Sequence, residues 1–252
     1  MYDAGAKPAA YLRAYAREFR TVEIDSTWYA TPAPERVRKW AQTVPAGFTF
    51  ATKLAREITH ERRLIGCDAL VAEFFDSMEA FGDTLEAVLV QMGPDFSPAE
   101  RDALFAFVER LPVGPPIAVE VRDPGWFEAP VYGELHEALS TRNIALALTD
   151  APFVPLDVML AALARPTADF TYLRWIGVHD AVRRFDRVVF DRREPIARWA
   201  AAIAARPARI KRVCGYVNNH YSGHAPATVR ALYAALGIGH ERPARIVQGS
   251  LF

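Results

Sequence analysis

Short runs of strand-forming residues alternate with amphipathic helical stretches along the sequence, and this alternation limits the possible folds more than any other feature. Seven candidate strands follow one another at intervals of roughly 25–40 residues, as βα units require. They are Thr21–Ile24, Phe48–Lys53, Leu85–Gln91, Ala118–Arg122, Ile144–Asp150, Phe170–Ile176 and Val213–Asn218. Because helical crossovers join parallel strands, the pattern predicts either a closed α/β barrel or an open doubly wound sheet.

Polar residues at the strand ends favour the barrel. All seven candidate strands carry such residues at or near their C-terminal ends: Glu23 and Asp25, Lys53, Gln91, Glu120 and Arg122, Asp150, Arg174, Asn218. The open sheet typically has a Gly-rich phosphate-binding turn near its first strand, and neither G-x-G-x-x-G nor G-x-x-x-x-G-K-[ST] occurs in the sequence. We therefore predict an α/β fold of the TIM type, with a polar site at the C-terminal rim.

Length and composition predict one ordinary globular domain over residues 1–252. Hydrophobic residues make up 51% and charged residues 24% of the chain, which is enough apolar surface for a substantial core. The 30 Lys and Arg balance the 30 Asp and Glu, so no global field would hold the protein on nucleic acid or an anionic membrane. With two distant cysteines, no basic and apolar leader and no membrane-spanning run, we expect a cytoplasmic protein.

Charged side chains of two strands are expected to share the barrel lumen. Side chains alternate along a strand, so Glu120 and Arg122 lie on one face while the flanking valines point to the helices. The same alternation places Glu23 beside Asp25. Each pair has two interpretations of equal weight: the charges neutralise one another inside the barrel, or they take part in function.

Three cations are predicted to meet at the rim, where they would suit a carboxylate or phosphate group. These are Lys53, Arg122 and Arg174, with Glu23, Glu120 or Asp150 available for proton transfer. Lys53 could also act as a Schiff-base nucleophile, although a lysine that neutralises nearby carboxylates is commoner.

Two histidine-containing segments are further candidates for the rim. His60 follows the Lys53 strand and is either an acid/base group or an ordinary loop histidine. Asn218 and Asn219 begin a loop that leads into a helix N-terminus, where backbone N–H groups can hold an anion; the alternative is a plain loop before Pro226.

The residue pattern predicts no metal site and identifies no cofactor. Glu23, Asp25, Glu120 and Asp150 are oxygen donors of the kind that Mg²⁺ uses, but the sequence lacks H-E-x-x-H and paired C-x-x-C motifs. The stretch 183–193 contains five arginines punctuated by aspartates, so a solvated surface is the better interpretation. It is still the one obvious local patch for nucleic acid in the sequence, so a nucleic-acid partner is not excluded.

Several segments resemble the domain-of-unknown-function family 72, also called YecE-like. They are Phe19–Tyr29, Phe48–Lys53 with Ile58–His60, Val119–Arg122 with Trp126 and Phe127, Asp169–Arg174, and Val217–His220. Their order along nearly the whole chain makes the resemblance specific. It implies a TIM-barrel fold and no established activity.

The chain departs from the family pattern in three places. Family members usually begin with an extra strand and a Gly/Trp loop, whereas this chain begins Met1–Ala6 at what looks like the first crossover, so we expect a barrel that lacks or opens at its first strand. The exposed edges of the Thr21 and Val213 strands would then invite pairing. Ile176 stands where many relatives have histidine, and Gln91–Pro94 differs from the usual loop text.

These observations predict an enzyme that acts on a small anionic or polar metabolite at the rim. The predicted catalytic residues are Glu23, Glu120 and His60. The predicted ligand-binding residues are Lys53, Arg122, Asp150, Arg174, Asn218 and Asn219. The alternative is a non-catalytic protein that binds a ligand or nucleic acid at the same rim.

Overall fold

Seven parallel strands form one curved sheet in the computed structural model, which describes residues 8–239. The strands pair in chain order from β1 to β7, and every predicted strand is present, with bounds that move by at most two residues. Their bounds are β1 Thr21–Ile24, β2 Thr49–Lys53, β3 Leu85–Gln91, β4 Ile117–Glu120, β5 Ala145–Asp150, β6 Phe170–Trp175 and β7 Arg212–Val217. The predicted start at Met1–Ala6 lies outside the described residues.

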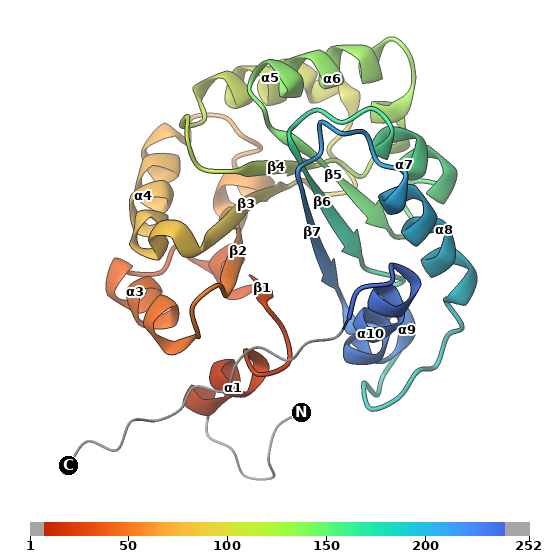
Figure 1. Ribbon diagram of the computed structural model, residues 1–252. Helices are drawn as coiled ribbons and strands as arrows, with labels where there is room; N and C mark the ends of the chain where they lie inside the picture. The colour runs from red at the N-terminus through yellow and green to blue at the C-terminus, as the bar shows by residue number, and fades with distance from the viewer. Residues whose placement is uncertain (1–7, 240–252) are drawn as a thin grey trace, which may run out of the picture.

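Helices cover the outer face of this sheet, as Figure 1 shows. Their bounds are α1 Pro8–Tyr15, α2 Ser26–Tyr29, α3 Pro34–Thr43, α4 Asp68–Met78, α5 Arg101–Arg110, α6 Val131–Thr141, α7 Leu156–Leu163, α8 Arg193–Ala204, α9 Asn219–Ser222 and α10 Ala225–Ala235. Shorter turns of helix are η1 Glu57–Glu61, η2 Glu79–Thr84, η3 Pro98–Glu100 and η4 Pro124–Phe127. The alternation of strand and helix makes this an α/β barrel of the TIM type.

Small side chains fill much of the lumen. A buried cluster inside the sheet contains Ala51, Ala87, Ala118, Ala145 and Ala147, together with a few larger residues. The outer face carries larger apolar residues such as Phe50, Val88 and Leu173, which pack against the helices. Because alternate residues of each strand point to opposite faces, this division between small and large residues favours a tightly curved sheet.

The barrel has one unsealed seam, between β1 and β7. No strand pairing joins these two strands in the described part of the chain, and they lie at the two ends of the sheet in Figure 1. A side-chain contact crosses the seam, where Thr21 Oγ1 lies 3.1 Å from the Tyr216 hydroxyl. Residues of β1 are only half-buried, whereas β4 and β6 are buried throughout. The expected opening of the barrel is thus confirmed.

Within residues 8–239, no helix is both long and apolar enough to cross a membrane. Cys67 and Cys214 are both free and buried, and Cys214 is 4% exposed inside β7, as expected for a small apolar side chain.

Gly177 lies in the turn after β6, and a substitution there tests how tightly this end of the barrel is packed. Its φ is +71°, and a Cβ atom there would lie 2.5 Å from the Cα atom of Tyr221. We expect Gly177→Ala to lower the free energy of unfolding by about 2 kcal/mol or more, because both the backbone conformation and the neighbouring backbone oppose a side chain. Urea unfolding measures the change.

Gly133→Ala is the matched control. Gly133 lies inside α6, and no atom lies within 4 Å of its added Cβ. Helix propensity predicts a gain of up to ~1 kcal/mol for this variant. Equal unfolding free energies for the two variants would contradict the tight contact at Gly177.

Candidate functional site

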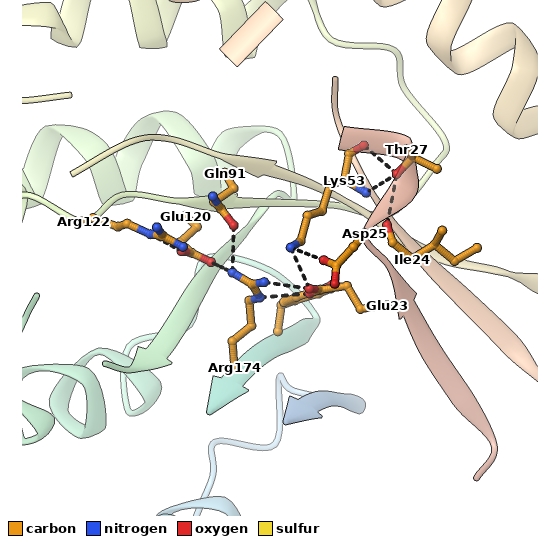
Figure 2. Close-up of polar contacts among 10 residues, drawn as sticks. Glu23, Ile24, Asp25, Thr27, Lys53, Gln91, Glu120, Arg122 and Arg174 are labelled. Atoms are coloured by element: carbon orange, nitrogen blue, oxygen red, sulfur yellow. Dashed lines mark hydrogen bonds and ion pairs between the residues drawn. The ribbon is translucent and has the colours of Figure 1, made fainter. Parts of the chain in front are cut away.

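Arg174 of β6 lies between two glutamates in the lumen, as Figure 2 shows. Its Nη2 atom is 2.6 Å from Glu23 Oε1, its Nε is 2.9 Å from Glu23 Oε2, and its Nη1 is 2.6 Å from Glu120 Oε2. Glu23 comes from β1 and Glu120 from β4, so one guanidinium joins three strands. Such charge-assisted bonds are the strong ones in proteins.

Lys53 and Arg122 extend this arrangement at its two ends. Lys53 Nζ lies 3.3 Å from Glu23 Oε1 and 2.5 Å from Asp25 Oδ1. Arg122 Nε lies 2.6 Å from Glu120 Oε1. Three cations therefore face three carboxylates, and the formal charge of the group is zero. The structure brings together all three predicted cations, but each has an acidic partner.

Burial and charge have opposite effects on the two glutamates. Burial alone would raise the pKa of Glu23, but the charges of Arg174 and Lys53 and the hydrogen bonds from Arg174 and Tyr172 lower it to about 2. Glu120 is fully buried, and its pKa is also lowered, because Arg174 and Arg122 outweigh desolvation. Both carboxylates are thus ionised at neutral pH.

Hydrogen-bond accounting divides the charged group into two layers. Glu23 accepts hydrogen bonds from Arg174 twice and from the Tyr172 hydroxyl at 2.8 Å, and it forms an ion pair with Lys53. Arg174 also donates to Gln91 Oε1 at 3.0 Å, so four of its donor positions are in use. We call this densely paired layer the inner cluster; it consists of Glu23, Gln91, Glu120, Tyr172 and Arg174.

A second layer stands above the inner cluster and retains donors or acceptors. The side chain of Asp25 is 72% exposed, and the Lys53 ammonium has one donor left after its two carboxylate contacts. Arg122 has its Nη atoms left, because within residues 8–239 only its Nε makes a hydrogen bond. We call Asp25, Lys53 and Arg122 the rim groups.

Thr27 fixes the position of the rim between β1 and β2. Its hydroxyl is fully buried and accepts the Lys53 amide at 2.9 Å, with the carbonyls of Ile24 and Lys53 at 3.1 and 2.9 Å as acceptors. This contact holds the backbone that presents Lys53 and Asp25 (Figure 2).

A cavity of about 640 Å³ along the seam reaches Glu23 and Arg174 of the inner cluster and Asp25 of the rim groups. Glu23, Asp25 and Arg174 line its charged end, and Thr21 and Tyr216 line it along the seam. The opening between β1 and β7 and the charged group are therefore parts of one site.

The predicted asparagines lie at the mouth of this cavity. Asn218 Oδ1 accepts the His220 amide at 2.9 Å, and Asn219 Oδ1 accepts the Ala225 amide at 2.9 Å, so both side chains also order the loop. Their Nδ2 groups make no hydrogen bond with any described residue and are available to a ligand.

Asp150, predicted to lie at the rim with the other charged residues, does not belong to the charged group. Its Oδ2 atom accepts Trp199 Nε1 at 3.0 Å and the Tyr221 hydroxyl at 2.8 Å, outside the lumen. Because Ala145 and Ala147 face the lumen, strand alternation directs Thr149 inward and Asp150 outward. Asp150 anchors α8 and α9 on the sheet.

His60 lies in η1, apart from the residues that line the cavity. Its Nδ1 atom is 2.8 Å from Thr59 Oγ1, and its ring meets the Trp28 ring edge-on at a centroid distance of 5.3 Å. Burial, and then the charge of Arg122, lower the pKa of His60.

The sequence does not single out Tyr172 and Thr27, although both contact the site. Strand alternation was a usable signal for Tyr172, which lies two residues before Arg174 on the same strand face. Thr27 carries no such signal, since its partner Lys53 is 26 residues away. Among the described residues, no group of three or more His, Cys, Asp or Glu is placed to hold a metal ion.

Comparison with known proteins identifies relatives along the whole chain. The family model described as "Protein of unknown function DUF72" matches residues 1–249. UPF0759 protein YecE of Escherichia coli (strain K12) is 33% identical over 177 residues, which are 70% of this chain and 60% of that protein. UPF0759 protein YunF of Bacillus subtilis (strain 168) is 25% identical over 66% of this chain and 61% of its own length. The matches therefore span about three fifths of these relatives.

Solved structures support the fold. A DUF72 family protein (EF0366) from Enterococcus faecalis V583 superposes with a TM-score of 0.75 at 22% identity, covering 92% of this chain and 95% of that one. A DUF72 family protein (TM1631) from Thermotoga maritima MSB8 gives a TM-score of 0.71 at 22% identity, covering 92% and 91%. At this identity the likeness concerns the fold alone.

Arg174→Met is expected to destabilise the protein by about 3–5 kcal/mol, because it leaves Glu23 and Glu120 as buried carboxylates without their shared cation. Arg110→Met is the control: Arg110 forms an exposed pair with Asp68, and its loss should cost less than ~1 kcal/mol. Urea unfolding compares the two variants. A similar small effect for both would mean that the inner cluster contributes little to stability.

The low pKa of Glu23 predicts a pH-dependent contribution to stability. The folded pKa of about 2 lies below the ordinary value of 4.5, so the ionised form is favoured in the folded state. The advantage of wild type over Glu23→Gln is therefore complete above pH 4.5 and falls as the pH drops towards 2, by about 3 kcal/mol in total.

Unfolding of both proteins between pH 7 and pH 2 measures this difference. Asp102→Asn serves as the control, because the Asp102 side chain is 99% exposed and its removal should give no comparable pH dependence. A wild-type advantage that stays constant down to pH 2 would contradict the assigned pKa.

Proposed function

This chain belongs to the DUF72 family of proteins of unknown function, and we propose that it is an enzyme acting on a small anionic or polar metabolite at the C-terminal rim of the barrel. One observation carries the proposal: a cavity of about 640 Å³ ends on a buried, fully paired ion cluster with unsaturated polar groups above it. Active sites of TIM barrels are built at this end of the strands. The volume suits a metabolite-sized ligand.

The two layers take different parts in the proposed enzyme. The inner cluster has few free donors or acceptors, so Arg174, Glu23 and Glu120 position the site rather than bind the ligand. Ligand contacts come from Asp25, whose carboxylate also pairs with Lys53, and from the free amides of Asn218 and Asn219. An ordered support beneath adaptable contacts is what precise ligand positioning requires.

Proton transfer does not fit the two buried glutamates. A carboxylate whose pKa is about 2, as at Glu23, is a weak base at neutral pH and is never protonated there to act as an acid. The pKa of Glu120 is lowered by the same kind of pairing. Of the three predicted acid/base residues, His60 is the one whose charge state suits the task.

A second candidate is a non-catalytic binding protein that uses the same cavity. The dense pairing of the inner cluster favours this binding protein, because a binder needs no group that changes its protonation state. The basic stretch 183–193 gives nucleic acid little support: Arg184 pairs with Asp186 at 2.7 Å and Arg193 with Asp191 at 2.6 Å, so its charge is partly neutralised.

Asn218→Asp tests the proposed function. The variant keeps the oxygen that accepts the His220 amide but replaces the free amide donors with a negative charge at the cavity mouth. We expect a panel of organic phosphates and carboxylates to contain a compound that raises the melting temperature of wild type and is converted to product, detected by mass spectrometry. Asn218→Asp should weaken its binding roughly tenfold or more.

Gln42→Glu adds the same charge on exposed α3, far from the cavity lining, and should bind the compound like wild type. Equal losses in both variants would remove the cavity as the binding site. A compound that binds in the cavity and is recovered unchanged under all conditions would favour the non-catalytic alternative.

A further inference from the structure

The guanidinium of Arg122 is held from two directions and leaves its outer edge open. Its Nε donates to Glu120 Oε1 at 2.6 Å, and its Cζ lies 4.9 Å from the centroid of the Phe153 ring. Within residues 8–239, the Nη atoms make no hydrogen bond. A guanidinium fixed in this way presents the two parallel donors that match a carboxylate or phosphate.

The Thr59 hydroxyl contacts the Nδ1 atom of the His60 ring. Thr59 Oγ1 lies 3.3 Å from the Ala55 carbonyl and 2.8 Å from His60 Nδ1. The hydroxyl has one hydrogen; when the Ala55 carbonyl takes it, Oγ1 accepts a hydrogen from Nδ1. In that tautomer of the neutral ring, Nε2 carries a lone pair that can take a proton.

His60 and Arg122 stand over the same pair of strand ends. A Cβ atom added at Gly93, just after β3, would lie 3.6 Å from His60 Cδ2. The Met92 amide, also after β3, donates to the Glu120 carbonyl of β4 at 2.9 Å, which places the two strand ends together. Arg122 follows Glu120 by two residues.

The charges that face His60 are predominantly positive. Arg122 comes from the end of β4, and Arg56 and Arg63 come from either side of η1, while Asp95 in the loop after β3 opposes them. Burial adds to the three arginines in lowering the pKa of His60, so the ring is neutral at pH 7. Next to it, the buried Nε1 of Trp28 has no hydrogen-bond partner within the described chain.

We propose that Arg122 and His60 form an anion-binding pair at the rim, in which Arg122 binds a phosphate or carboxylate group and His60 Nε2 accepts a proton from the same ligand. The imidazole becomes imidazolium, and the ligand keeps the electron pair and gains one unit of negative charge, which Arg122 stabilises. Trp28 Nε1 offers a further donor to such an anion. A protonated phosphate monoester or a hydroxy acid has both groups that this pair requires.

The inference rests on the proposed function, because it assigns an anionic group and a proton of the ligand to a part of the rim that lies outside the cavity lining. It differs from the three-cation site predicted from the sequence. Lys53 and Arg122 stand at opposite ends of the charged group, and Arg174 uses four of its five donors within the cluster, so in this proposal Arg122 holds the anion without the other two cations.

Inorganic phosphate is the probe for this pair. Its affinity is measured by calorimetry at pH 7, and the titration of His60 is followed by NMR of the ring nitrogens with and without phosphate. In wild type we expect phosphate to bind and to raise the pKa of His60, because an anion at Arg122 offsets the positive charge around the ring. The Nε2 resonance should report an unprotonated nitrogen before phosphate is added.

Two substitutions of Arg122 distinguish the effect of its two parallel donors from the effect of its charge. R122K keeps a cation beside Glu120 but loses the parallel donors, and R122Q loses both; we expect each to weaken phosphate at least tenfold and to abolish its effect on His60. R110Q is the control, because Arg110 pairs with Asp68 on the surface. This variant should bind phosphate like wild type.

Wild-type affinity in R122K and R122Q would overturn the pair, and so would phosphate binding that leaves the His60 titration unchanged. If R122Q does not fold, the phosphate affinity of R122K and the NMR titration of wild type still test the anion pair. The phosphate result does not depend on turnover. If phosphate binds as expected but no metabolite is converted, the anion pair stands and the proposed enzyme activity is wrong. If a metabolite is converted but phosphate does not bind at Arg122, the enzyme activity stands and the anion pair is wrong.

Discussion

The burial of one arginine is the constraint on which the rest of this barrel depends. Arg174 is 7% exposed, and a cation in that environment needs carboxylates close at hand. The chain supplies them from 151 residues away at Glu23 and from 54 residues away at Glu120. Because β1 has no backbone pairing with β7 in the described chain, the bonds from Arg174 and Tyr172 to Glu23 also tie the first strand to the last part of the sheet.

The same pairing decides which charges remain for chemistry. A row of alternating charges runs from Lys53 through Glu23, Arg174 and Glu120 to Arg122, and its members satisfy one another from the centre outwards. Groups at the centre use most of their donors and acceptors and are ionised, whereas those at the two ends keep free donors. Function is therefore expected at the ends of the row, and the charges that are most deeply buried serve chiefly to hold these ends in place.

Strand alternation predicted much of the site, and it failed where the phase of a strand was misjudged. It placed Glu120 and Arg122 together on the lumen face of β4, and the structure confirms this. At β5 the lumen residues are Ala145 and Ala147, so the polar residue at the strand end, Asp150, points outward to Trp199 and Tyr221. Which opposite charges meet across the lumen depends on the curvature of the sheet. The alternation of residues within one strand does not predict that curvature.

The seam links the stability of this barrel to access to its site. In a closed barrel the inner cluster would be covered by neighbouring strands, but here the cavity reaches Glu23 and Arg174 because β1 and β7 stand apart. Thr21 contacts Tyr216 across this gap, and Glu23 of β1 accepts a hydrogen bond from Tyr172 of the next strand, β6, in place of backbone pairing. Side-chain bonds leave space between strands that a ladder of backbone bonds would fill. The opening that leaves the sheet without a β1–β7 pairing thus also leaves the cavity that reaches the charged group.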